Sequence, residues 1–234
     1  MSRPRAVLFD SGGIFLLPQH DRVTGAFARA EVDVAADRLD DAHYRAAASF
    51  STDVDVDADW AGSWRAYLEA YIDACGVGDA DREEVHRHLD SEFADAALWL
   101  SVASGCREGL QAIVETGVDL GVVSNADGVM GARLRELEIL QVGPGIGVEV
   151  GCVIDSGAVG VMKPDPRIFE IALDALAVDA DDAWYIGDMP AFDVLGARRA
   201  GLRPFLMDPL GLHLDADYDR VASLAELAER IGRA

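Results

Sequence analysis

Short apolar segments alternate with helical patterns over most of the chain, and this alternation constrains the fold more than any other feature. The apolar segments are residues 6–9, 118–123, 148–154, 183–186 and a final one at 203–207. The helical patterns are residues 104–116, 128–138, 164–177, 191–200 and 223–231. Strands that alternate with helices predict a parallel sheet covered by helices on both faces.

A helical insertion interrupts this alternation after the first strand. From about residue 21 to residue 99, alanine, charged residues and scattered aromatic residues recur at helical spacing, without a convincing strand. The run from Asp53 to Asp59 alternates acids with small residues, but it lacks the glycine and glutamate of a calcium loop. We interpret the run as a solvated loop between helices, and the insertion as a unit lying over one edge of the sheet.

The net charge of −22, from 42 acidic and 20 basic side chains, excludes several partners. Nucleic acids and anionic membrane surfaces repel such a protein. No apolar run is long enough for a membrane span, and no secretion signal is evident. The three cysteines are far apart and odd in number, as expected of reduced thiols. We therefore expect a cytoplasmic protein that binds neither nucleic acid nor membrane; monomer and homodimer both remain open.

Two residue types occur once each, Lys163 and Asn125. A sole representative does not reflect background usage, so chemistry is a better explanation for its position. Apart from Lys163, every lysine or arginine position of the chain holds arginine. This suggests that position 163 needs a compact ammonium charge rather than a guanidinium group.

Polar residues stand at the carboxyl ends of three predicted strands: Asp10, Ser124 and Asp188. In a parallel sheet these ends meet at one edge, where ligands bind. Carboxylates at such an edge repel one another unless a cation lies between them, and hard oxygen ligands suit Mg²⁺. A nearby lysine and hydroxyl could hold phosphate oxygens while Asp10 attacks phosphorus.

Four segments of the chain resemble the haloacid dehalogenase superfamily, in the subfamily with a helical cap inserted after the first motif. They are VLFDSGG (7–13), VVSNAD (122–127), VGVMKPDPRIFEIAL (159–173) and YIGDMPAFDVLGARRAG (185–201). The resemblance implies an α/β fold, with a Rossmann-like, three-layer parallel-sheet core at residues 1–17 and 100–234. Residues 18–99 would form the α-helical cap. It also implies Mg²⁺-dependent hydrolysis of a phosphate monoester, with a small phosphorylated metabolite as substrate.

The resemblance assigns roles to individual residues. Asp10 is the nucleophile and a magnesium ligand, and Asp188 is the second carboxylate ligand. Ser124 and Lys163 hold the phosphoryl group, and Lys163 also offsets the charge of the nucleophile. Asp193 supports the site.

Gly12 departs from the family pattern. Phosphatases of this family usually carry a second aspartate there, which protonates the leaving oxygen and later activates water. Such acid–base catalysis supplies about 10²–10⁴-fold, so its loss could cost roughly 3–5 kcal/mol of barrier. Gly12 would still offer magnesium its main-chain carbonyl and face the substrate. Asn125 would either contact the substrate or orient its own loop.

Three interpretations fit the missing acid. The chain could be a phosphatase that favours good leaving groups or takes its proton from substrate, water or a cap residue such as His20. It could perform C–P or C–halogen chemistry, although the sole lysine leaves none for a Schiff base in the cap, and dehalogenases of this superfamily work without metal. It could also bind phosphate without catalysis.

Four cap residues could line a substrate pocket or simply pack the helices: Arg45, Trp60, Trp64 and Tyr67.

Overall fold

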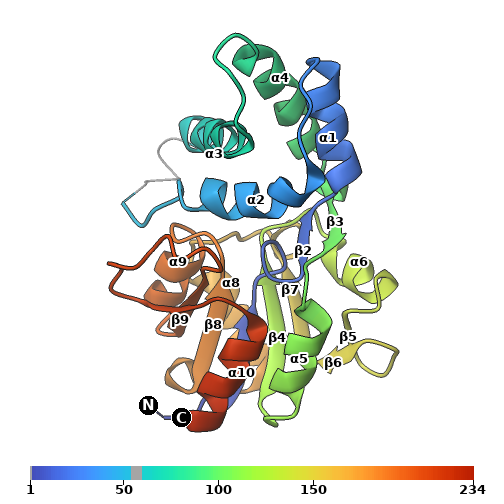
Figure 1. The fold of residues 1–234 in the computed structure, drawn as a ribbon. Coiled ribbons are helices and arrows are strands. Elements are labelled where there is room, and N and C mark those ends of the chain that lie inside the picture. The colour runs from blue at the N-terminus through green and yellow to red at the C-terminus, as the bar shows by residue number, and fades with distance from the viewer. Residues whose placement is uncertain (1, 54–59) are drawn as a thin grey trace.

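A parallel sheet of six strands forms the centre of the computed structural model, which describes residues 2–53 and 60–234 (Figure 1). In spatial order the strands are β10 (Asp219–Val221), β9 (Arg203–Met207), β8 (Ala183–Gly187), β1 (Ala6–Phe9), β4 (Asp119–Ser124) and β7 (Cys152–Asp155). All neighbouring pairs are parallel. The sheet confirms the predicted α/β class and brings the carboxyl ends of β1, β4 and β8 side by side.

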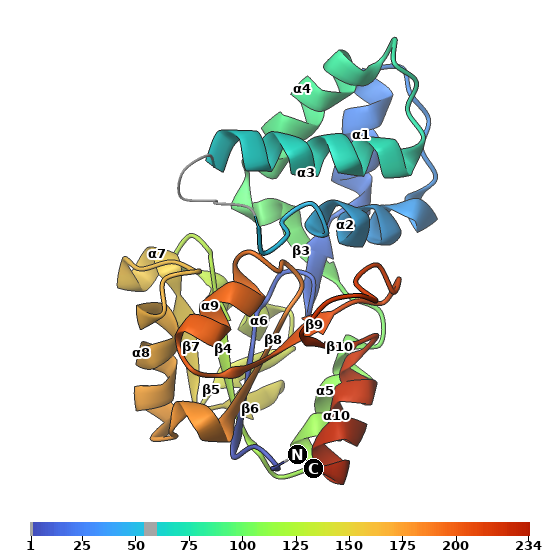
Figure 2. The same ribbon diagram turned by 90° about the vertical axis from the view of Figure 1, so that its left-hand side faces the viewer.

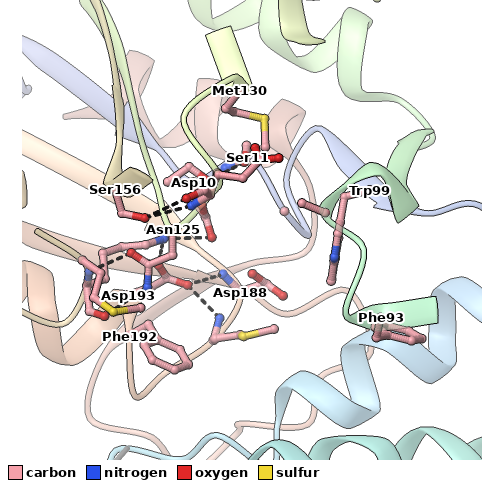
Figure 3. A pocket seen from close by; sticks show the side chains of 18 of the residues that line it. Asp10, Ser11, Phe93, Trp99, Asn125, Met130, Ser156, Asp188, Phe192 and Asp193 are labelled. Carbon is pink, nitrogen blue, oxygen red and sulfur yellow. Dashed lines mark hydrogen bonds and ion pairs between the residues drawn. The ribbon is translucent and has the colours of Figure 1, made fainter. Parts of the chain in front are cut away.

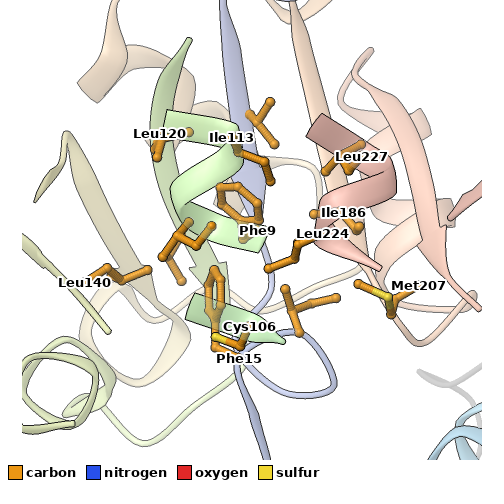
Figure 4. Packing of buried hydrophobic residues seen from close by; sticks show 14 of the residues in the cluster. Phe9, Phe15, Cys106, Ile113, Leu120, Leu140, Ile186, Met207, Leu224 and Leu227 are labelled. Carbon is orange, nitrogen blue, oxygen red and sulfur yellow. The ribbon is translucent and has the colours of Figure 1, made fainter. Parts of the chain in front are cut away.

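Helices cover both faces of the sheet because successive side chains of each buried strand point in opposite directions. Val7 and Phe9 of β1 belong to the apolar cluster on one face (Figure 4), and Ala6 and Leu8 belong to the cluster on the other. The helices on the first face are α5 (Cys106–Val114), α6 (Met130–Glu136) and α10 (Leu224–Arg233). Those on the second face are α8 (Arg167–Leu176) and α9 (Asp193–Arg199).

The helical insertion lies above the carboxyl ends of the strands (Figures 1 and 2). Its helices are α1 (His20–Arg29), η1 (Ala36–Arg38), α2 (Leu39–Ala47), α3 (Trp60–Cys75), α4 (Arg82–Phe93) and η2 (Ala96–Leu98). They share an apolar cluster of their own, which also takes in Ala191 and Phe192 of the core. The main-chain nitrogen of Ala191 donates to the carbonyl of Phe50 at 2.8 Å, so the insertion rests directly on the loop after β8.

A short antiparallel hairpin, β2 (Leu16–Pro18) with β3 (Trp99–Val102), joins the insertion to the core. The division into a core of 1–17 and 100–234 and a cap of 18–99 stays a prediction, which the separate apolar cluster of the insertion supports. Both chain ends lie at the end of the core farthest from the insertion (Figures 1 and 2). Within the described ranges, no helix combines the length and apolarity needed to cross a bilayer.

Two details of the predicted strands are wrong. Residues 148–154 form two strands rather than one, β6 (Val148–Val150) and β7, and β6 pairs with β5 (Leu140–Val142) in a separate small sheet. The chain changes sheets at Gly151, whose main-chain nitrogen donates to the carbonyl of Leu120 at 2.8 Å. β9 is not the final strand, because β10 pairs beside it.

Other boundaries differ only slightly, and short helices occupy two connections. These are α7 (Ser156–Val159) and η3 (Ala180–Asp182). The predicted helix at 164–177 begins at Arg167, so its two prolines precede the first turn. Most of the predicted acidic loop, residues 54–59, lies outside the described residues.

Candidate active site

The carboxyl ends of three neighbouring strands bring the predicted site residues together. Phe9 lies opposite Val122 of β4 and Ile186 of β8, so the residues that follow these strands share one edge. A cavity of about 580 Å³ opens at this edge (Figure 3). Every site residue predicted from the sequence lines it: Asp10, Gly12, Ser124, Asn125, Lys163, Asp188 and Asp193.

Lys163 lies at the centre of the polar floor of the cavity. Its Nζ is 2.9 Å from Asp10 Oδ2, 2.7 Å from Asp193 Oδ1 and 2.9 Å from the Tyr185 hydroxyl. Burial alone would lower the pKa of Lys163, but the two carboxylates outweigh burial and raise it. The buried ammonium therefore stays charged and binds both acids.

Asp193 connects Lys163 to the loop after β8. Its Oδ1 lies 2.7 Å from Lys163 Nζ and 2.8 Å from the Tyr185 hydroxyl, and its Oδ2 accepts hydrogen bonds from the main-chain nitrogens of Asp188 and Met189. Both oxygens are thus engaged within the protein, which fits the supporting role expected for Asp193. Tyr185 was not among the predicted site residues, because the sequence pattern of a buried strand predicts that its tyrosine is a core residue.

Asn125 holds the main chain of Lys163. Its Nδ2 donates to the Lys163 carbonyl at 3.0 Å, and its Oδ1 accepts from the Lys163 nitrogen at 2.7 Å. The amide therefore orients a loop, but that loop is the one carrying Lys163 rather than its own. The neighbouring Ser124 hydroxyl lies 2.6 Å from the Ser11 hydroxyl at the floor of the cavity.

The carboxylates of the site have too little compensating positive charge. One oxygen each of Asp10, Asp188 and Asp193 lies within 4.8 Å of the others. Burial raises the pKa of Asp10 to about 7; Lys163 opposes this shift, while Asp193 and Asp188 add to it. Burial also raises the pKa of Asp188. One ammonium does not balance three acids, two buried and one partly buried, so the donor set fits a hard divalent cation.

A histidine of the insertion reaches the loop after β8. Nε2 of His43, on α2, lies 2.9 Å from Asp188 Oδ2, and both side chains are buried. The two atoms lie within ion-pair distance, but their geometry is not that of a hydrogen bond. Nδ1 of His43 lies 2.9 Å from the Tyr67 hydroxyl. His43 was also not among the predicted site residues, since nothing in the sequence pattern of α2 distinguishes it from a packing residue.

Two adjacent glycines shape the loop after β1 in different ways. Gly13 has φ +65°, and a Cβ there would lie 2.3 Å from Asp188 Cγ, so only glycine fits. Tyr44 fixes the same residue by donating to the Gly13 carbonyl at 2.8 Å. At Gly12 a Cβ would lie 3.6 Å from the ring of Trp99, an ordinary contact. Position 12 can therefore accept a side chain, and position 13 cannot.

Two of the four cap residues considered for the pocket lie elsewhere. Trp64 lines the cavity, whereas Tyr67 is fully buried in the insertion and Arg45 is exposed. The side chain of Trp60 is outside the described residues. His20 pairs with a carboxylate of the insertion at 2.7 Å and is absent from the described lining, so it is not positioned as a substitute proton donor.

Sequence comparisons agree with the fold. The chain belongs to the haloacid dehalogenase-like hydrolase family, whose model matches residues 4–201. It is 31% identical over 173 residues to haloacid dehalogenase-like hydrolase domain-containing protein 3 of Danio rerio, an alignment covering 72% of this chain and 68% of that protein. It is 32% identical over 158 residues to a phosphoserine phosphatase of Thermus thermophilus, covering 64% of this chain and 57% of that enzyme.

Solved structures extend the similarity over the whole fold. The crystal structure of a dehalogenase superposes with a TM-score of 0.56 and 21% sequence identity, covering 98% of each chain. At this identity the likeness establishes a shared fold and leaves the chemistry to be argued from the site.

The raised pKa of Asp10 predicts how stability depends on pH. The folded state holds this proton more tightly than the unfolded state, so the stabilising contribution is full below pH 3.8 and is lost as the pH rises to about 7. Asp10→Asn loses the ion pair with Lys163, but without metal its stability relative to wild type should increase as the pH rises through this window. Urea unfolding in EDTA measures the difference, and a difference independent of pH would contradict the assignment.

Mg²⁺ provides the complementary measurement. Because a cation offsets the charged carboxylates, we expect Mg²⁺ to raise the melting temperature of the wild type more at pH 8 than at pH 5. The Asp10→Asn variant is the control, and its response to Mg²⁺ should be smaller at pH 8.

The buried contact of His43 predicts a stability loss. In His43→Leu, Asp188 and Tyr67 lose a polar partner, and an unsatisfied buried group costs about 1–3 kcal/mol. Urea unfolding should show a loss of this size. The control, His88→Leu on the partly exposed side of α4, should change the free energy of unfolding by less than about 0.5 kcal/mol. Equal losses in both variants would show that the contact between insertion and core contributes nothing specific.

Proposed function

We propose that this chain is a Mg²⁺-dependent phosphohydrolase that acts on a small phosphorylated metabolite through a phosphoryl group carried on Asp10. One observation carries the proposal: Asp10 Oδ2 lies 2.9 Å from the buried Lys163 Nζ at the floor of a cavity. The other carboxylate oxygen accepts from the Ser11 nitrogen at 2.7 Å, so the nucleophile is held in one orientation. The similarity to a phosphoserine phosphatase supports the same reaction class.

Asp10 attacks phosphorus, so a bond forms between its carboxylate oxygen and phosphorus while the ester oxygen leaves. Lys163 and the Ser124 hydroxyl hold the phosphoryl oxygens. Asn125 fixes the main chain of Lys163, and we assign it this positioning role in preference to substrate contact. Water then hydrolyses the aspartyl-phosphate and frees Asp10.

The carboxylates of Asp10 and Asp188 and the main-chain carbonyl of Gly12 would hold the cation. Asp193 would not, because each of its oxygens already has two partners within the protein, whereas each oxygen of Asp10 has one. The chemistry that bound Mg²⁺ supplies here is neutralisation of charge between the phosphate and the carboxylates.

Because position 12 is glycine, no carboxylic acid at this position can protonate the oxygen of the leaving group. The leaving group then takes its proton from water or from the substrate, and poor leaving groups react slowly. The insertion contacts the core beside the cavity through His43 and Phe50.

A phosphatase panel of alkyl, aryl and acyl phosphates tests this function. Wild type should release phosphate with Mg²⁺ and lose activity in EDTA. Asp10→Asn should be inactive, and the control Asp215→Asn, an exposed acid, should match wild type. Gly12→Asp should speed alkyl phosphate hydrolysis by up to about 10²–10⁴-fold.

Two results would reject the proposal. A wild type that is inert on every ester and acyl phosphate is a binding protein on this fold. Activity that persists in EDTA points to metal-independent chemistry of the dehalogenase kind.

A further inference from the structure

Large apolar side chains form the cavity wall beyond Asp10. Those contributed by the insertion and the hairpin are Trp64, Phe93 and Trp99, and those of the core are Met130, Met189 and Phe192. In Figure 3, Trp99 and Phe93 stand across the cavity from Asn125 and Asp193. The lining therefore has a polar floor for a phosphoryl group and an apolar wall for the rest of the substrate.

The cationic side chains of the described lining are already paired. Lys163 binds Asp10 and Asp193. Arg133 donates through both terminal nitrogens to the two carboxylate oxygens of Asp127, each at 2.7 Å. Such a bidentate pair satisfies the guanidinium. A carboxylate on the substrate would thus meet no uncompensated positive charge at the wall.

A further acid makes a second anion still less favourable. Asp90 lines the cavity in addition to the acids of the floor, whereas the charge of Asp127 is offset by Arg133. Like charges in a partly buried site repel strongly. The wall therefore selects against phosphorylated acids such as phosphoserine.

Trp99 takes the position next to the missing acid. A Cβ at Gly12 would lie 3.6 Å from its six-membered ring, so the ring borders the space where the family's second aspartate would extend. A leaving group placed there meets an aromatic face rather than a proton donor. Phenolic oxygens, with a pKa of about 10, leave as anions far more readily than alkyl alcohols.

We propose that the substrate is an aryl phosphate, the phosphate monoester of a phenol without a second anionic group, and that Trp99 is a specificity-determining residue. This inference rests on the proposed phosphatase activity. The aromatic ring stacks on the apolar wall, and the phosphoryl group faces Asp10 and Lys163.

The chemical balance of the reaction is simple. The Asp10 oxygen forms a bond to phosphorus, and the bond between phosphorus and the aryl oxygen breaks. The electron pair leaves on the phenolate, which takes a proton from solvent water. A second water attacks phosphorus and the bond between phosphorus and the Asp10 oxygen breaks, so that a proton of this water passes to the released phosphate and Asp10 returns as a carboxylate.

A matched pair of substrates tests the inference on the wild-type protein with Mg²⁺. Phenyl phosphate and 4-carboxyphenyl phosphate share the aryl ester and differ in one carboxylate. We expect kcat/KM for phenyl phosphate to be at least about tenfold higher than for 4-carboxyphenyl phosphate or phosphoserine. Equal values, or a preference for either carboxylate substrate, would overturn the inference.

Two variants locate the selectivity. Trp99→Leu should lower the ratio of kcat/KM for 1-naphthyl phosphate to that for acetyl phosphate by about tenfold, mainly through KM. The control Ile146→Ala, an exposed apolar residue that is not part of the described lining, should leave the ratio unchanged. Asp127→Asn frees Arg133 and should raise the relative rate with 4-carboxyphenyl phosphate. An unchanged ratio in both Trp99→Leu and Asp127→Asn would also overturn the inference.

Acetyl phosphate separates this inference from the proposed function. If the protein hydrolyses acetyl phosphate but shows no preference for uncharged aryl esters, the proposed phosphatase function stands and the proposed substrate class is rejected. Failure to hydrolyse any phosphate compound rejects both.

Discussion

The ammonium group of Lys163, buried between the carboxylates of Asp10 and Asp193, is the interaction on which the site depends. Breaking a buried ion pair leaves an uncompensated charge and is far more costly than losing a surface pair. The segments that supply these groups, the end of β1, the first turn of α9 and the loop before α8, are therefore fixed relative to one another. Asn125 adds a further constraint, since it holds the main chain of Lys163 from the end of β4.

Lys163 contacts two of the three carboxylates, and the third carboxylate is the one that the insertion contacts. Asp188 is the acid that Lys163 does not contact directly, and His43 reaches it from α2. The contact between insertion and core and the charge balance of the cavity floor therefore both involve the carboxylate of Asp188. The same scarcity of positive charge fits a divalent cation at the floor and an uncharged leaving group at the wall.

The sequence was sufficient to predict the residues at the strand ends, because parallel strands carry their carboxyl ends to one edge whatever the details of packing. Lys163 was identifiable from its single occurrence. Tyr185 and His43 were not, since each occupies a position whose pattern is that of core packing and acquires its role from segments distant in sequence. The split at Gly151 and the short strand β10 depend on main-chain pairing, which the apolar pattern does not encode.

Identification of the phosphorylated residue during turnover tests the central claim most directly. The protein is mixed with acetyl phosphate and Mg²⁺, quenched rapidly in acid and mapped by peptide mass spectrometry. The account predicts a phosphoryl group on Asp10 that is absent from Asp10→Asn. A phosphoryl group on another residue, or turnover by Asp10→Asn at the wild-type rate, would contradict it.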